Sequence, residues 1–157
     1  MNTVLRISSE DLDATVEAGV TRLQLDKALR PGSRAMVTAV CVPISRLAEC
    51  IVDTMKDHGG ASFPIALVGH AGDGNFHLNY ILDPASQAEI DEARRLNERM
   101  VMRALAMGGT CTREHGVGSG TMKFLEAEHG PALDVMRTIK RALDPDNRMN
   151  PGKMVEI

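Results

Sequence analysis

The stretch GHAGDGNFHLNYIL, residues 69–82, decides the local fold because it joins a glycine-rich bend to a strand-like run. Fully extended, the seven steps from His70 to His77 would span roughly 23 Å. Two imidazoles that bind one zinc-like ion each lie about 2.1 Å from it. The chain must therefore fold back if both histidines are to bind the same ion. The glycines of the stretch permit positive φ angles at such a bend: Gly69, Gly72 and Gly74.

The second half of this stretch predicts a β-strand. Asp73-Gly74 is a strong turn dipeptide, and alternating apolar residues follow it. His77 and Asn79 then share one face of the strand. The opposite face carries the residues predicted to enter the core: Phe76, Leu78, Tyr80 and Leu82. A polar face that begins at a bend is a good position for a chemical site.

A second glycine-rich stretch, GGTCTREHGVG, occupies residues 108–118. It supplies Glu114 as a candidate third ligand, since two histidines and one carboxylate around an open position is a recurring arrangement for zinc and related metals. The neighbouring His115, with an ordinary pKa near 6.5, is then a candidate base. Spacing alone leaves structural roles open for these residues, because the chain has no H-E-x-x-H or C-x-x-C motif.

Other reactive side chains are given structural roles. His58 and His129 each precede a glycine at a predicted helix end. The cysteines form no C-x-x-C pair and are odd in number, so they are expected to be small buried hydrophobes in a reducing compartment: Cys41, Cys50 and Cys111. The ten methionines are expected to fill the core.

Strands and helices alternate along the chain. Strands are predicted at residues 4–7, 14–18 and 36–42, and a capping box formed by Thr21 and Gln24 begins a helix. A further helix follows Pro43, with Leu47, Ile51 and Met55 on one stripe, and stops at Gly59-Gly60. Ser86 and Glu89 form a capping box for a long helix that ends near residue 107. Its periodic positions are Ile90, Ala93, Asn97, Met100, Val101 and Ala104. The last helix begins at Pro131 and runs through Met136, Ile139 and Leu143.

This order of elements predicts an α+β sandwich with a mostly antiparallel sheet. The composition is that of a globular domain, with 43% hydrophobic and 25% charged residues. A net charge of −3, three Phe and one Tyr exclude a typical nucleic-acid-binding surface. No run of 18 apolar residues suggests a transmembrane segment, and the first ten residues do not resemble a signal peptide. A cytoplasmic protein is therefore expected.

Several separated motifs resemble the C-terminal domain of FAD-linked oxidases, the group of D-lactate dehydrogenase, glycolate oxidase and D-2-hydroxyglutarate dehydrogenase. They are GHAGDGNFH, GGTCTREHGVG, GTMKFLEAEHG and the closing MRTIKRALDPDNRMNPGKMV. The resemblance covers residues 37–155 and implies a ferredoxin-like α/β sandwich.

The resemblance also implies roles for individual residues. His70, His77 and Glu114 would hold a divalent metal such as zinc, manganese or iron, and Asn79 would help to bind the substrate, a small 2-hydroxy acid. His115 would be the general base and, with Asn150, would lie near the flavin. The redox chemistry itself would belong to FAD.

Residues 1–30 resemble a remnant of the family's FAD-binding domain, residues 31–35 a junction, and residues 36–157 the substrate domain. The intervening part of the flavin domain has no counterpart here, so two functions stay open. The chain is either a D-2-hydroxy-acid dehydrogenase, with FAD in a partial site or on a flavoprotein partner subunit, or a catalytically inactive metal-binding remnant or accessory subunit. Because strands are missing, an open sheet edge is expected to favour a homo-oligomer.

Overall fold

The computed structural model describes residues 4–8, 13–16, 32–112 and 116–157 of the chain. Near the N-terminus, β1 (Val4–Ser8) and β2 (Asp13–Val16) pair in antiparallel fashion. This pair confirms the two strands predicted there, although β2 begins one residue early and ends at Val16. The helix predicted from Thr21 lies outside the described residues.

A three-stranded antiparallel sheet forms the centre of the protein, with the order β3-β5-β4. Its strands are β3 (Arg34–Cys41), β4 (Ile65–His70) and β5 (Asn75–Leu82). In the register of the sheet, His77 lies opposite Ala39 on one side and Val68 on the other. Because side chains alternate along a strand, this register assigns every residue of the sheet to one of two faces.

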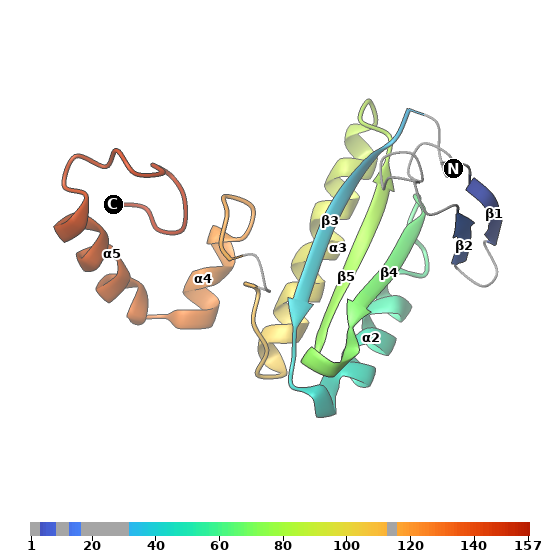
Figure 1. Cartoon of the computed structure of the whole chain (residues 1–157), viewed down its shortest axis with the longest axis horizontal. Coiled ribbons are helices and arrows are strands. Elements are labelled where there is room, and N and C mark those ends of the chain that lie inside the picture. The colour runs from blue at the N-terminus through green and yellow to red at the C-terminus, as the bar shows by residue number, and fades with distance from the viewer. Residues whose placement is uncertain (1–3, 9–12, 17–31, 113–115) are drawn as a thin grey trace.

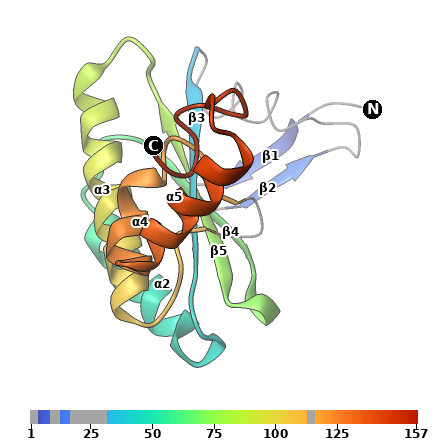
Figure 2. The same ribbon diagram turned by 90° about the vertical axis from the view of Figure 1, so that its left-hand side faces the viewer.

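Two helices, α2 (Ile44–His58) and α3 (Gln87–Ala106), cover one face of the sheet (Figures 1 and 2). The capping box predicted for α3 forms only in part. The Ser86 side chain accepts a hydrogen bond from the Glu89 N–H at 3.3 Å. The Glu89 carboxylate, however, accepts from the Asp83 N–H at 2.8 Å, which fixes the turn that leads into the helix.

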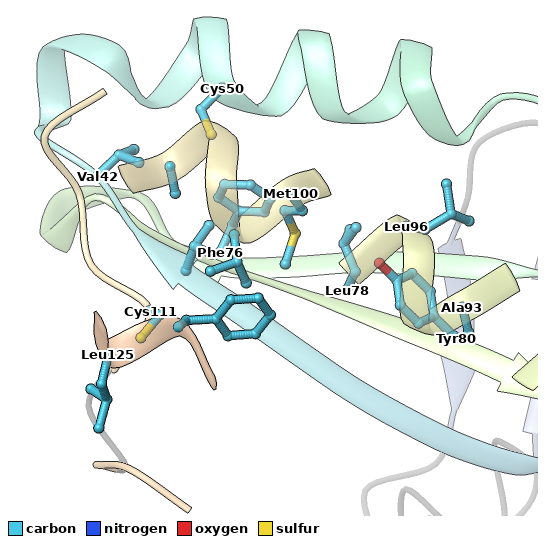
Figure 3. Close-up of a cluster of buried hydrophobic side chains, with 14 of the residues drawn as sticks. Val42, Cys50, Phe76, Leu78, Tyr80, Ala93, Leu96, Met100, Cys111 and Leu125 are labelled. Atoms are coloured by element: carbon cyan, nitrogen blue, oxygen red, sulfur yellow. The ribbon is translucent and has the colours of Figure 1, made fainter. Parts of the chain in front are cut away.

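The core fills the space between this face and the two helices (Figure 3). The predicted inward face of β5 is confirmed, since its residues Phe76, Leu78, Tyr80 and Leu82 are all buried. On α3 the buried stripe contains Leu96 rather than the predicted Asn97. Asn97 is half-buried because its side-chain oxygen accepts a hydrogen bond from the Thr38 hydroxyl of β3.

The order β3-α2-β4-β5-α3 is that of a ferredoxin-like α+β sandwich up to its second helix, which confirms the predicted fold class. A single antiparallel bridge between Cys41 and Thr110 continues the pattern at the outer edge of β3. Within the described residues, no strand pairs with the rest of that edge. Oligomer formation through this edge stays a prediction.

After the sheet domain, α4 (Met122–His129) and α5 (Ala132–Leu143) form an arm to one side of it (Figure 1). The sequence predicted the end of α4 at His129 but not its beginning at Met122, and Phe124 and Leu125 on this helix are buried in the core. On α5, two residues of the expected apolar stripe lie in solvent: Ile139 is 54% exposed and Leu143 77%. In the described part of the chain, none of the helices has the length and apolar character needed to cross a membrane.

Candidate functional site

The bend between β4 and β5 folds back as predicted, through the short 3-10 helix η1 (Ala71–Asp73). Gly74 has a φ of 70°, and a Cβ there would lie 2.0 Å from the Val42 carbonyl oxygen. At Gly69, where φ is not positive, a Cβ would lie 2.5 Å from the Asn75 oxygen. Gly72 has neither constraint. Positive φ was thus predicted correctly at Gly74 only, while Gly69 is needed for close backbone approach.

The bend brings His70 and His77 together on the sheet face opposite the helices. Their ring centroids are 6.3 Å apart and the ring planes meet at 83°. An ion bound about 2.1 Å from one nitrogen of each ring would hold the centroids about 5 to 6 Å apart. Small side-chain rotations would reach this spacing, because His70 is exposed and His77 half-buried. The two histidines therefore fit a shared metal ion.

Asn79 lies two residues beyond His77 on the same face of β5. Its cross-strand neighbours are Val37 and Ala66, and those of His77 are Ala39 and Val68. The polar side chains on this part of the sheet are thus flanked by small or aliphatic ones. Such a surface can place a few polar contacts beside a small ligand without competing donors or acceptors.

Glu114 and His115 lie outside the described residues. The structure describes the same glycine-rich stretch from Gly108 to Thr112. Gly108, with a φ of 77°, ends α3. A Cβ at Gly109 would lie 2.3 Å from the Cys41 oxygen. Thr110 then bridges to Cys41, with N···O distances of 2.8 and 3.2 Å.

In the register of the sheet, the Cys41–Thr110 bridge lies in the same row as His70, the last residue of β4. Cys41 pairs with Asn75, and Asn75 pairs with His70. Within the described residues, no group of three or more His, Cys, Asp or Glu side chains could hold a metal ion. The pair of histidines would need a further ligand to form a three-residue site.

Sequence reasoning missed Glu128, a residue of α4. Its carboxylate accepts a hydrogen bond from the Cys111 N–H at 2.9 Å. Burial raises the pKa of Glu128, but hydrogen bonds from Thr110 and Cys111 outweigh this effect and lower the pKa overall. No local pattern marks this residue, because its partner lies 17 positions earlier in the chain.

Asn150, predicted to lie near a flavin, is exposed and belongs to the segment that follows α5. It adopts a φ of 51° and borders an apolar groove of about 390 Å³. Lys140, Asp144 and Met149 secure this closing segment: the lysine bonds to the Asp144 carboxylate, and the Met149 N–H donates to Asp144 at 2.8 Å. Figure 1 shows this segment well apart from the β4–β5 bend, so the structure does not bring Asn150 to the histidine pair.

The remaining reactive side chains have structural roles, as expected. The His58 Nδ1 lies 2.7 Å from the Thr54 carbonyl oxygen and its Nε2 lies 2.9 Å from the Tyr80 hydroxyl. Burial lowers the pKa of His58 and is the main cause of the shift. His129 ends α4, as predicted. All three cysteines are free; Cys50 and Cys111 are buried as predicted, but the prediction is wrong for Cys41, which is only half-buried.

Comparison with known proteins places these motifs in a family. The model of "FAD linked oxidases, C-terminal domain" matches residues 7–154. A mitochondrial D-lactate dehydrogenase [cytochrome] of Arabidopsis thaliana is 52% identical over 82% of this chain and 23% of its own length. A probable mitochondrial D-lactate dehydrogenase of Danio rerio is 50% identical over 83% of this chain and 26% of its own length. Glycolate oxidase subunit GlcD of Bacillus subtilis is 31% identical over 94% of this chain and 31% of its own length.

Two consequences follow from these relatives. The chain spans about a quarter of the length of the first two, which match 23% and 26% of their residues. The expectation of a cytoplasmic protein is wrong, because both of these relatives are named as mitochondrial proteins and point to the mitochondrion instead.

Proposed function

Since the chain belongs to the family of FAD-linked oxidases, we propose that it carries the metal- and substrate-binding part of a D-2-hydroxy-acid dehydrogenase. The main support is the geometry of His70 and His77, whose ring centroids lie 6.3 Å apart on the sheet face opposite the helices. D-lactate, named in several relatives, is the first substrate to test.

In this proposal, His70 and His77 hold a divalent metal together with Glu114. Four residues of chain can bridge at most about 14 Å, so Glu114 is within reach of the sheet end at which Thr110 pairs with Cys41. A bound metal would act as a Lewis acid toward the carboxylate and hydroxyl of the substrate.

Two further side chains would orient the substrate and accept its proton. Asn79 would orient the 2-hydroxy acid through its amide, from the same face as His77. His115, adjacent to Glu114, would accept the proton of the substrate hydroxyl as general base. The aliphatic residues that flank Asn79 would limit access of water to that contact.

The chain would supply fewer contacts to the flavin than to the metal and the substrate. FAD would supply the redox chemistry when bound, with His115 near its ring, whereas Asn150 belongs to a closing segment that lies apart from the β4–β5 bend and has no role at this site. We propose that residues 1–30 derive from the flavin domain, residues 31–35 are the junction and residues 36–157 the substrate domain. A separate flavoprotein could supply the remaining flavin contacts.

A metal-binding remnant or accessory subunit is the second candidate function. The observation that favours it is the length of the match, about a quarter of each of the first two relatives. Titration of the purified chain with FAD, followed by flavin fluorescence, separates the two functions. Saturable binding at micromolar affinity supports an enzyme, and an absence of binding supports the remnant.

His77→Ala tests the metal site itself. The substitution removes one of two paired imidazoles, and because the half-buried His77 faces away from the core between the sheet and the helices, divalent-metal binding should be lost while the fold stays intact. His129→Ala, at the end of α4, is the matched control and should keep full metal content. Equal metal in His77→Ala and wild-type protein by elemental analysis would exclude this site.

A further inference from the structure

Helix α4 holds the chain on both sides of the segment that carries Glu114 and His115. At its last turn, Glu128 accepts from the Cys111 N–H at 2.9 Å. At its N-cap, the Thr121 hydroxyl donates to the Gly118 carbonyl at 3.1 Å and accepts from the Gly118 N–H at 3.2 Å. An eight-residue helix is about 12 Å long, so both attachments belong to one short rigid element.

Before the segment with Glu114 and His115, hydrogen bonds hold three consecutive residues, from Thr110 to Thr112. Thr110 and Cys111 both hydrogen-bond to Glu128. The Thr110 hydroxyl oxygen in turn accepts from the Thr112 N–H at 3.1 Å and lies 2.7 Å from the Thr112 hydroxyl. On its other side, Thr110 is bridged to Cys41 of β3. The backbone is therefore held up to the last described residue before the segment.

The Glu128 side chain is suited to this role because it is largely enclosed. It is 12% exposed, and the His129 Nε2 lies 3.7 Å from its carboxylate. Its hydrogen bonds favour the ionised carboxylate. An ionised acceptor forms shorter and stronger hydrogen bonds to backbone N–H groups than a neutral one does.

We propose that Glu128 is a positioning residue for the metal site, because it holds residues 110–112 at the end of β3, in the row of the sheet that contains His70, and so fixes where the segment with Glu114 and His115 begins. This inference rests on the proposed function. Glu114 lies three chain steps after Cys111, a reach of at most about 10 Å. Displacement of Cys111 should therefore weaken metal binding.

Glu128→Gln tests the proposal with minimal change in volume. Gln keeps one acceptor oxygen but turns the other into an N–H₂ donor, which opposes the donors of Thr110 and Cys111. Glu126→Gln is the matched control on the same helix, because Glu126 is exposed and its ion pair with Arg137 is long, at 3.9 Å.

Affinity for Mn²⁺ or Zn²⁺ is measured by calorimetry, and backbone exchange by hydrogen–deuterium exchange. Glu128→Gln should weaken metal binding about tenfold or more and speed exchange of the Cys111 and Thr112 amides, with α4 still protected. Glu126→Gln should match wild type. Wild-type metal affinity in Glu128→Gln would overturn the proposal, and so would a loss of protection throughout α4, which would show a role in folding only.

The same experiment separates this inference from the proposed function. If the wild-type chain binds neither metal, the metal site is wrong. Faster exchange confined to residues 111 and 112 in Glu128→Gln would then still support the anchoring by Glu128. Unchanged exchange would overturn it as well.

Discussion

Gly74→Ala should destabilise the protein strongly, because Gly74 is buried although the residues before it in the bend are exposed. Gly74 has a φ of 70°, and a residue with a side chain pays about 1 to 2 kcal/mol in this region. The added Cβ would also lie 2.0 Å from the Val42 oxygen, so the backbone must move. That movement endangers the 2.9 Å hydrogen bond from the Val42 N–H to the Gly74 oxygen, worth about 1 kcal/mol. The free energy of unfolding should therefore fall by about 2 to 3 kcal/mol.

Gly72→Ala is the control, because a Cβ there meets nothing within 4 Å and the residue has no positive φ. Its free energy of unfolding should stay within about 0.5 kcal/mol of wild type. Thermal unfolding followed by circular dichroism measures both variants. For a chain of this size, Gly74→Ala should lower the unfolding temperature by about 5 to 10 °C. Equal unfolding temperatures for the two variants would refute the reasoning from backbone approach.

Two further predictions concern the helical side of the sheet. The pKa of His58 is lowered by burial, so the unfolded chain binds its proton more tightly than the folded protein does. Stability should be complete above the unfolded pKa of about 6.5 and should decline as the pH falls below it, and chemical denaturation of wild type and His58→Gln should show a weaker decline in the variant. Ser86→Ala should cost about 1 kcal/mol because the Glu89 N–H loses its N-cap acceptor; an unfolding temperature equal to that of wild type would contradict this.

The sequence was sufficient where local pattern and tertiary packing agree. The alternation along β5 correctly separated the buried Phe76 and Tyr80 from His77 and Asn79, because the period of a strand assigns its faces directly. The end of α2 at His58 was likewise predicted from the glycine pair that follows it. The placement of His70 beside His77 followed from the same bend.

Features that depend on distant partners could not be predicted. Helix α4 contacts residues 110 and 111 through Glu128, a carboxylate with no distinguishing neighbours in the sequence. The apolar stripe of α5 predicted burial, yet Leu143 is 77% exposed, because periodicity shows which face is apolar and not what covers it. Asn97 fell on the expected stripe of α3, but its amide is used by Thr38, and Leu96 takes the buried position.

The two glycine-rich stretches are related through the end of β3. Gly74 approaches the carbonyl oxygen of Val42, and Gly109 approaches that of Cys41, the preceding residue. The first stretch also hydrogen-bonds to Val42 through Gly74, and the second hydrogen-bonds to Cys41 through Thr110. A side chain at either glycine would push one stretch away from β3 and so away from the other. The glycines therefore do more than relax the bends, since they allow two segments far apart in sequence to pack against consecutive peptide groups. Any site that draws one ligand from each stretch depends on this shared backbone contact.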